Sequence, residues 1–253
     1  MLNWRDGAWT GDTAGLTAAQ LVLIFGDRGV LAEGAAQAAL RDLAPQAQLA
    51  GCSTAGEIGG GEVREGSAVA VGITFAGTTV RVAHREIAAA AQSRETGEAL
   101  ARELLQPGLR HVFVLSDGLK VNGTTLAAGL RQVLPAGVCA TGGLAGDGAA
   151  FEDTLVVHGE ETRSGPVVAL GFYGEALQIG WGSAGGWSAF GPRRLVTRSE
   201  GNVLYSLDDK PALELYKLYL GDRAAGLPAT GLLFPLELLA DTEATASRER
   251  ERG

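Results

Sequence analysis

The chain has 253 residues, of which 46% are hydrophobic and 20% are charged, and its mean hydropathy is +0.11. This composition predicts one large folded domain or two modest ones and excludes a globally disordered chain. Acidic residues outnumber basic ones by 29 to 21, which gives a net charge of −8. Because an acidic surface repels phosphate groups, we expect neither nucleic acid nor an anionic membrane surface as a partner.

The few cysteines and histidines argue against a disulfide framework and against a metal site. Cys52 and Cys139 cannot form a four-cysteine zinc site, and His84, His111 and His158 lack the close spacing of metal-binding motifs. The chain opens without an apolar signal segment, and no run reaches the roughly 18 apolar residues of a membrane span. We therefore expect a cytoplasmic protein with no metal.

In the first half of the chain, short apolar runs that predict strands alternate with segments whose apolar residues are spaced as in a helix. Residues 21–25 and 48–52 are predicted as buried strands, and a helix is predicted over 31–43, ending before Pro45. Further strands are expected at 68–75 and 79–83. A linking helix over 94–106 follows. The second half repeats this order, with a helix over 124–134 and strands at 111–115, 138–141, 154–158, 167–173 and 177–181.

The two halves also resemble each other in sequence. A shift of 90 residues aligns segment 21–57 with segment 111–147 without a gap. The identical positions include the pairs Asp27/Asp117, Arg41/Arg131, Pro45/Pro135 and Gly56/Gly146. We therefore predict an α/β fold of internally duplicated β-α-β-β-β units with mixed sheets, each unit containing a right-handed parallel crossover.

After Pro192 the pattern changes to strand, turn and strand within 193–207, followed by a helix to Leu220 with Asp209 as its N-cap. The expected organisation is an N-terminal segment over 1–19, a main domain over 20–187 and an incomplete α+β domain over 188–240. The repeat units of the main domain cover about 20–90 and 110–185. We expect the charged segment 241–253 to be disordered.

The first glycine-rich turn, residues 51–57, has the sequence GCSTAGE and follows a predicted strand. Ligands bind beyond the carboxyl ends of parallel strands, and backbone N–H groups of such a turn can point at an anion. The candidate ligand-binding residues here are Cys52, Ser53, Thr54, Gly56 and Glu57. The alternative is a tight turn whose glycines serve backbone geometry alone.

The second glycine-rich turn, residues 141–148, has the sequence TGGLAGDG. No helix is predicted after it, so it does not fit a dinucleotide-binding motif. Its candidate residues are Gly142, Gly143, Gly146 and Asp147.

The SDGLKVNG loop, residues 116–123, follows the first strand of the second half and adds Asp117, Lys120 and Asn122 as candidate residues. Asn122 also fits a helix N-cap. Trp187, in a glycine-rich segment, is expected either to cover a ligand or to pack in the core. A hydrolase or transferase using Cys52 or Ser53 as nucleophile is a further alternative, although the sequence contains no G-x-S-x-G motif.

These segments together resemble the FIST (F-box and intracellular signal transduction) family of bacterial sensory domains. The matching stretches are GCSTAGEI at 51–58, VFVLSDGLKVNG at 112–123, TGGLAGDG at 141–148 and GSAGGW at 182–187. The resemblance implies a non-catalytic sensor of an amino acid or similar metabolite that signals to a histidine kinase or another output protein. It also implies an alternative, a haem-binding nitric-oxide sensor, for which His84 is the least constrained axial ligand.

A zwitterionic ligand would need partners of both charges. We expect backbone N–H groups and an arginine to hold its carboxylate, and Glu57 or Asp147 to hold its ammonium group. From the resemblance we also expect a C-terminal FIST region that is shorter than in the family, and a signal that passes to another chain. Unpaired strand edges in a shortened domain would favour association, so we expect either a homodimer or poor solubility.

Overall fold

The computed structural model describes residues 1–182, 186–188 and 190–239. The chain divides into two compact units, unit 1 (Met1–Gly182) and unit 2 (Ser183–Gly253). The predicted disordered segment 241–253, and part of the glycine-rich segment before Trp187, lie outside the described residues. Within the described part of the chain, no helix has the length and apolar character needed to cross a membrane.

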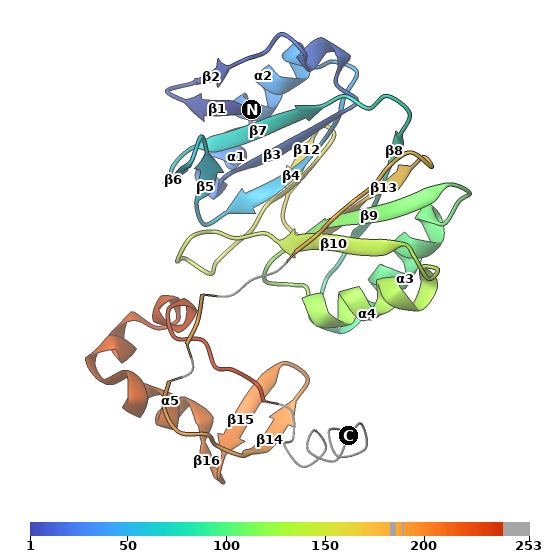
Figure 1. Cartoon of the computed structure of the whole chain (residues 1–253). Helices are drawn as coiled ribbons and strands as arrows, with labels where there is room; N and C mark the ends of the chain where they lie inside the picture. The colour runs from blue at the N-terminus through green and yellow to red at the C-terminus, as the bar shows by residue number, and fades with distance from the viewer. Residues whose placement is uncertain (183–185, 189, 240–253) are drawn as a thin grey trace. The chain divides into compact units, whose positions relative to one another are not determined.

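Unit 1 contains two large sheets, which Figure 1 shows one above the other. The seven-stranded sheet has the order β12-β11-β4-β3-β7-β1-β2. Its strands are β1 (Leu2–Arg5), β2 (Ala8–Gly11), β3 (Leu21–Asp27), β4 (Gln48–Thr54), β7 (Ala68–Ile73), β11 (Val156–His158) and β12 (Glu161–Arg163). The four-stranded sheet has the order β10-β9-β13-β8. Its strands are β8 (Thr79–Glu86), β9 (Leu109–Ser116), β10 (Cys139–Leu144) and β13 (Pro166–Tyr173).

Each sheet is built around one parallel pair of strands. Strands β3 and β4 are parallel and are joined through helices α1 (Arg28–Glu33) and α2 (Ala35–Leu43), while α4 (Gly123–Val133) joins the parallel pair β9 and β10. On its other side, β3 pairs with the antiparallel strand β7, and β9 pairs with the antiparallel strand β13. The prediction of an α/β fold with mixed sheets is therefore confirmed.

The two halves exchange strands between the sheets. Strand β8, from the first half, pairs with β13, and the hairpin β11–β12, from the second half, pairs with β4. A small hairpin of β5 (Glu57–Gly59) and β6 (Glu62–Arg64) forms a separate two-stranded sheet. The sequence carried no sign of this exchange, because strand pairing depends on residues far apart in the chain.

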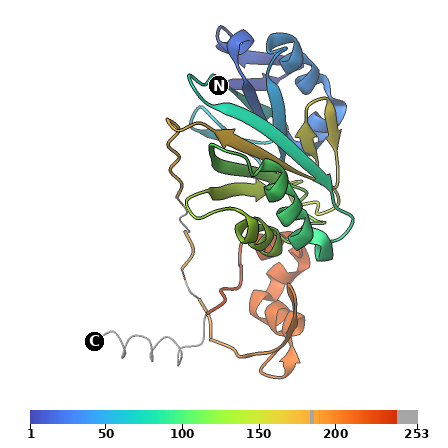
Figure 2. The same ribbon diagram turned by 90° about the vertical axis from the view of Figure 1, so that its right-hand side faces the viewer.

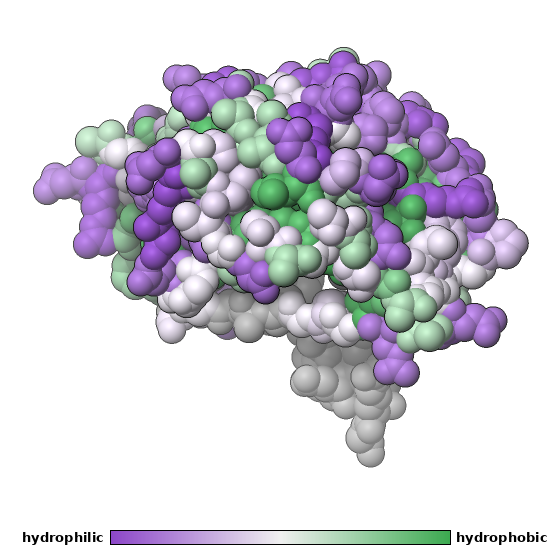
Figure 3. Space-filling model, turned by 90° about the horizontal axis from the view of Figure 1, so that it is seen from above, coloured by the Kyte–Doolittle hydropathy of each residue, from purple (hydrophilic) through white to green (hydrophobic). Residues whose placement is uncertain are grey.

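Unit 1 has four layers, because successive side chains along a strand point to opposite faces of its sheet and pack against different elements. Val22 and Ile24 of β3 pack with Leu31 and Leu40 of α1 and α2. The neighbouring Leu21, on the opposite face of β3, packs against residues of the four-stranded sheet. The far face of that sheet is covered by α4 and by α3 (Ser93–Leu104). The layers are thus helices, sheet, sheet and helices. The face viewed in Figure 3 is mostly hydrophilic around a small hydrophobic area.

Most predicted elements of unit 1 are confirmed to within a few residues. Strands β5, β6 and β12 were not predicted, and three further differences follow. The helix predicted over 31–43 is two helices, because Gly34 adopts a left-handed conformation with φ of 76° between them. The strand predicted at 177–181 is wrong, since β8 and β9 already occupy both edges of β13. The N-terminal segment forms the hairpin β1–β2, which turns at Asp6 and Gly7 with positive φ, a signal that the sequence contained.

Unit 2 contains the predicted pair of strands, β14 (Val196–Glu200) and β15 (Val203–Leu207), and a helix, α5 (Ala212–Leu220). The predicted N-cap at Asp209 is wrong, because β16 (Lys210–Pro211) pairs with β15 and keeps the chain extended up to the helix. Short 3₁₀ helices follow at Gly221–Gly226 and Ala229–Leu232.

Candidate functional site

Three segments singled out in the sequence meet at the carboxyl ends of the parallel strands in unit 1. The N–H of Gly146, in the second glycine-rich turn, donates to the carbonyl of Ser53 in the first turn at 2.8 Å. The N–H of Ala145 donates to the carbonyl of Ser116 at the end of β9, also at 2.8 Å. In Figure 1 the arrowheads of β4 and β10 point to the same side of unit 1. The two turns are therefore neighbours in direct contact.

Ser53 holds the two halves together. Its side chain is fully buried, and its hydroxyl oxygen accepts the N–H of Leu155 at 2.9 Å. Its own N–H donates to the carbonyl of Leu155 at 2.8 Å. The segment after β10 is thereby attached to the end of β4, and the Ser53 hydroxyl is occupied within the fold.

Glu57 is likewise occupied by internal hydrogen bonds. Its side chain is 2% exposed, and its two carboxylate oxygens accept from the hydroxyl of Thr54 at 2.8 Å and the hydroxyl of Ser67 at 2.7 Å. A buried carboxylate with both oxygens engaged is poorly placed to meet a ligand from solvent. Asp147, which is half-buried, is the more accessible of the two expected ammonium partners.

Asp147 and Asp117 each organise a loop. The carboxylate of Asp147 accepts the N–H groups of Phe151, Glu152 and Asp153 at 2.7–3.1 Å. Asp117, which is buried, accepts the N–H groups of Leu119, Lys120 and Gly165 and the hydroxyl of Ser164. Burial favours a raised pKa for Asp117, but these hydrogen bonds outweigh it and hold the pKa below its ordinary value.

The two other candidates of the SDGLKVNG loop differ in what they contact. Asn122 accepts the N–H of Thr125 at 3.1 Å and is the N-cap of α4, so its interpretation as a helix cap is confirmed. Lys120 is exposed, and its ammonium group donates to the neutral hydroxyl of Ser164 at 3.0 Å. Lys120 is thus a cation at the edge of the turns with no ion-pair partner among the described residues.

The glycines of the turns serve different purposes. A Cβ at Gly142, where φ is +155°, would lie 1.8 Å from the carbonyl oxygen of Val114, so only glycine fits. A Cβ at Gly143 would meet nothing within 4 Å, and its backbone is exposed. Gly56 has a φ of +153° before β5. Gly143 therefore supplies the most open backbone of the three.

An ion pair that the sequence did not indicate lies beside these turns. Arg28, the first residue of α1, donates to the carboxylate of Asp153 at 2.7 Å. This bond is the main reason why the pKa of Asp153 lies below its ordinary value. Arg28 directly follows Asp27 at the end of β3, and a polar residue directly after a strand is a candidate site residue from the sequence alone. Asp153 carried no comparable signal.

The structure disfavours two of the expected roles, that of Cys52 as a nucleophile and that of Trp187 as a core residue. The Cys52 thiol is buried, which raises its pKa to about 12 and keeps it protonated at neutral pH. Since the thiolate is the nucleophile, a catalytic cysteine is disfavoured here. Trp187 lies in unit 2 and its side chain is 64% exposed, so it is not packed in a core.

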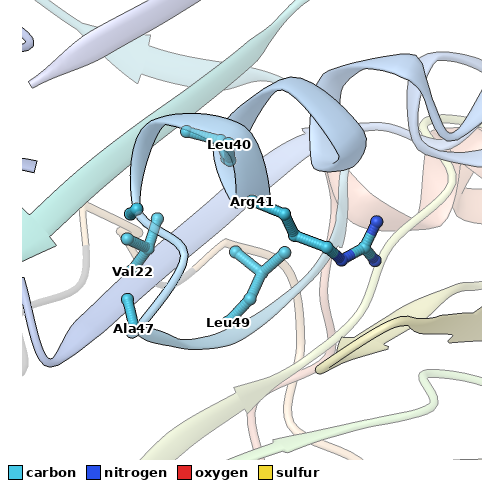
Figure 4. Close-up of a pocket in the computed structure, with 6 residues that line it drawn as sticks. Val22, Leu40, Arg41, Ala47 and Leu49 are labelled. Atoms are coloured by element: carbon cyan, nitrogen blue, oxygen red, sulfur yellow. The ribbon is translucent and has the colours of Figure 1, made fainter. Parts of the chain in front are cut away.

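Two cavities lie away from the turns. The first, shown in Figure 4, holds about 10 Å³ beside Leu40 and Arg41, which is barely enough for one water. The second is an open groove of about 510 Å³ along β8 that reaches His158. His158 of β11 stacks on His84 of β8 with ring centroids 4.5 Å apart. His84, the candidate axial ligand, is thus beside a second histidine.

No curated protein matches the chain. The family model FIST N domain matches residues 20–210, which is well over half of the chain and includes both glycine-rich turns and the SDGLKVNG loop. The chain therefore belongs to the FIST family, whose domains are generally non-catalytic sensory domains of signal transduction.

Proposed function

We propose that unit 1 binds a small zwitterionic metabolite, such as an amino acid, at the edge formed by the two glycine-rich turns. The observation that carries this proposal is the direct hydrogen bond between the turns, from Gly146 to Ser53 at 2.8 Å. It brings strand ends of both sheets to one place, where a ligand would contact both halves of the unit. Membership of a sensory family supports a binding role over a catalytic one.

The charges around the turns suit such a ligand. Lys120 offers a cation whose only hydrogen-bond partner among the described residues is the neutral hydroxyl of Ser164. We assign the ligand's carboxylate to Lys120. Asp147, which is half-buried at the second turn, offers a carboxylate to its ammonium group. Charge-assisted hydrogen bonds of this kind are the stronger class.

We also propose that the two β-α-β units derive from one duplicated module. Asp27 and Asp117 occupy equivalent positions in the 90-residue alignment. Each accepts, with its Oδ1, the N–H groups of the residues two and three positions later. This shared arrangement supports a common origin. In a duplicated sensor, a ligand held between the copies would bias their arrangement according to its different affinity for each state.

The signal would pass to a separate output protein, for which a histidine kinase is the expected partner. Family membership supports this step, because FIST domains act in signal transduction.

Isothermal titration of the full chain with a panel of the common amino acids tests the ligand proposal. At least one should bind, and Lys120→Met and Asp147→Asn should each weaken binding about tenfold, the size of one charge-assisted hydrogen bond. Lys210→Met, in unit 2, is the matched control and should leave binding unchanged. The proposal is rejected if no amino acid of the panel binds, or if both turn variants bind with the affinity of the unmodified chain.

A further inference from the structure

Strand β8 has an open edge. It is the last strand of the four-stranded sheet and pairs only with β13. The N–H of Ile87, just after β8, donates to the carbonyl of Gly165 beyond β13 at 3.0 Å. Because N–H and C=O groups alternate in direction along an antiparallel strand, the groups of residues 80, 82 and 84 point away from β13. The carbonyl of His84 is taken by the guanidinium of Arg85 at 2.7 Å. Val80 and Val82 therefore present an unpaired edge.

A groove of about 510 Å³ lies along this part of β8, and Val80, Arg81 and Val82 are among the residues that line it. On one side it is lined by Glu103, Leu104 and Gln106, at and just after the end of α3. On the other side lie Gln48 of β4 and His158 of β11. Figure 2 shows β8 running between helix α3 and the hairpin β11–β12. The unpaired edge is thus held between two walls.

The groove carries one positive charge without a carboxylate partner. Glu103 is paired with Arg85 at 2.5 Å. Arg81 instead donates to the neutral amide of Gln106 and lies 5.6 Å from the centre of the Tyr173 ring. Among the described residues, no carboxylate forms an ion pair with Arg81. A bound chain with an acidic side chain at this point would supply the missing partner.

We propose that β8 binds a short, extended, acidic segment of a partner protein, which adds one strand to the four-stranded sheet. Main-chain hydrogen bonds to Val80 and Val82 would hold the segment, and Arg81 would select for aspartate or glutamate in it. The walls favour a single strand over a second copy of the chain, because a second copy would bring its own α3 and hairpin against the same walls. This surface is separate from the glycine-rich turns and does not depend on the proposed metabolite site.

The test uses the ¹⁵N-labelled full chain and an acetylated, amidated peptide of about seven alternating valine and glutamate residues, long enough to span β8. We expect amide shifts and slower hydrogen exchange at Val80 and Val82. Ala140 on β10, whose N–H points away from β9 at the opposite edge of the same sheet, serves as the internal control and should not change. A peptide N-methylated at alternate residues should not bind, since it lacks the edge N–H groups.

Charge selection is tested with a lysine version of the peptide, which should bind about fivefold or more weakly at low salt, as expected for one interfacial ion pair. Arg81→Gln should remove most of that difference, whereas Arg131→Gln, on the exposed face of α4, should not. The proposal is overturned if no peptide shifts Val80 or Val82 at millimolar concentration, or if the N-methylated peptide binds equally well. Self-association that protects β8 without peptide would also overturn it, in favour of a second copy.

Discussion

Gly142 and Gly143 are neighbours on β10 with opposite requirements. A side chain at Gly142 would collide with the Val114 carbonyl oxygen, while a side chain at Gly143 would enter open space. The sequence presents them as one glycine pair and predicts the same role for both. Only the position of β9 beside β10 separates a packing glycine from an accessible one.

Substitution of these two glycines should therefore have very different effects. Gly142→Ala should reduce the free energy of unfolding by more than about 2 kcal/mol, because the chain must move to relieve a 1.8 Å contact and a strained φ. Gly143→Ala, its matched control, should change stability by less than about 1 kcal/mol. Urea denaturation followed by circular dichroism measures both, and equal losses would contradict the assignment.

The polar candidates show where residue types stop being informative. The sequence predicts Ser53, Glu57 and Asp117 as ligand-binding residues, because hydroxyls and carboxylates at strand ends often bind ligands. Their polar atoms are instead occupied by distant groups, among them the N–H of Leu155 and the hydroxyls of Ser67 and Ser164. Whether a polar group is free depends on such partners, and no local pattern reveals them. Asn122 was predictable as a helix cap because its partner lies only three residues away.

At the scale of elements, β8 and β11 contact each other through the stacked rings of His84 and His158. Burial, followed by the neighbouring His84, lowers the pKa of His158, and Arg163 acts in the same direction while Glu161 opposes it. The folded state therefore takes up a proton at lower pH than the unfolded state. The contribution of His158 to the free energy of unfolding should be fully present above the ordinary histidine pKa of about 6.5. It should fall as the pH drops below that value.

His158→Phe keeps an aromatic ring at this position but removes its titration. We expect the loss of stability between about pH 7 and pH 5 to become smaller in this variant. Urea unfolding at several pH values measures the slope, and His111, whose pKa burial also lowers, is present in both proteins and contributes equally. An unchanged slope would show that the stacked pair does not cause the pH dependence.

Strand order is the element-scale feature that the sequence did not predict. Apolar runs marked most strands, and prolines marked the ends of the helices. The placement of β8 in the second sheet and of β11–β12 in the first depends on the match between whole sheet faces, such as Val82 and Val168 packing with Cys52 and Val156. The strand predicted at 177–181 was wrong, because the preceding strand, β13, already has β8 and β9 on its two sides.

On the scale of the whole molecule, the hydrophobic core belongs to unit 1. Among the described residues, all four clusters of buried residues consist of side chains from Met1–Gly182. We predict that a fragment ending at Gly182 folds cooperatively, with a free energy of unfolding within about 2 kcal/mol of the full chain, because it contains all of these clusters.

Hydrogen exchange of the fragment provides the measurement. The amides of Ile24 and Leu170, in the cores of the two sheets, should be protected to the same degree as in the full chain. Loss of protection together with a broad unfolding transition would show that unit 2 is required for folding. The domain boundary predicted at residues 187–188 remains a prediction.

Local information in the chain was sufficient for the α/β class, for most strands and helices and for the family, because each depends on spacing or motifs within a few tens of residues. The contact between the two glycine-rich turns, the exchange of strands and the walled edge of β8 arise only in the folded chain. Each requires the pairing of strands that are distant in the chain, such as β4 with β11 or β8 with β13. Such contacts are selected by the packing of complete sheet faces rather than by any local pattern.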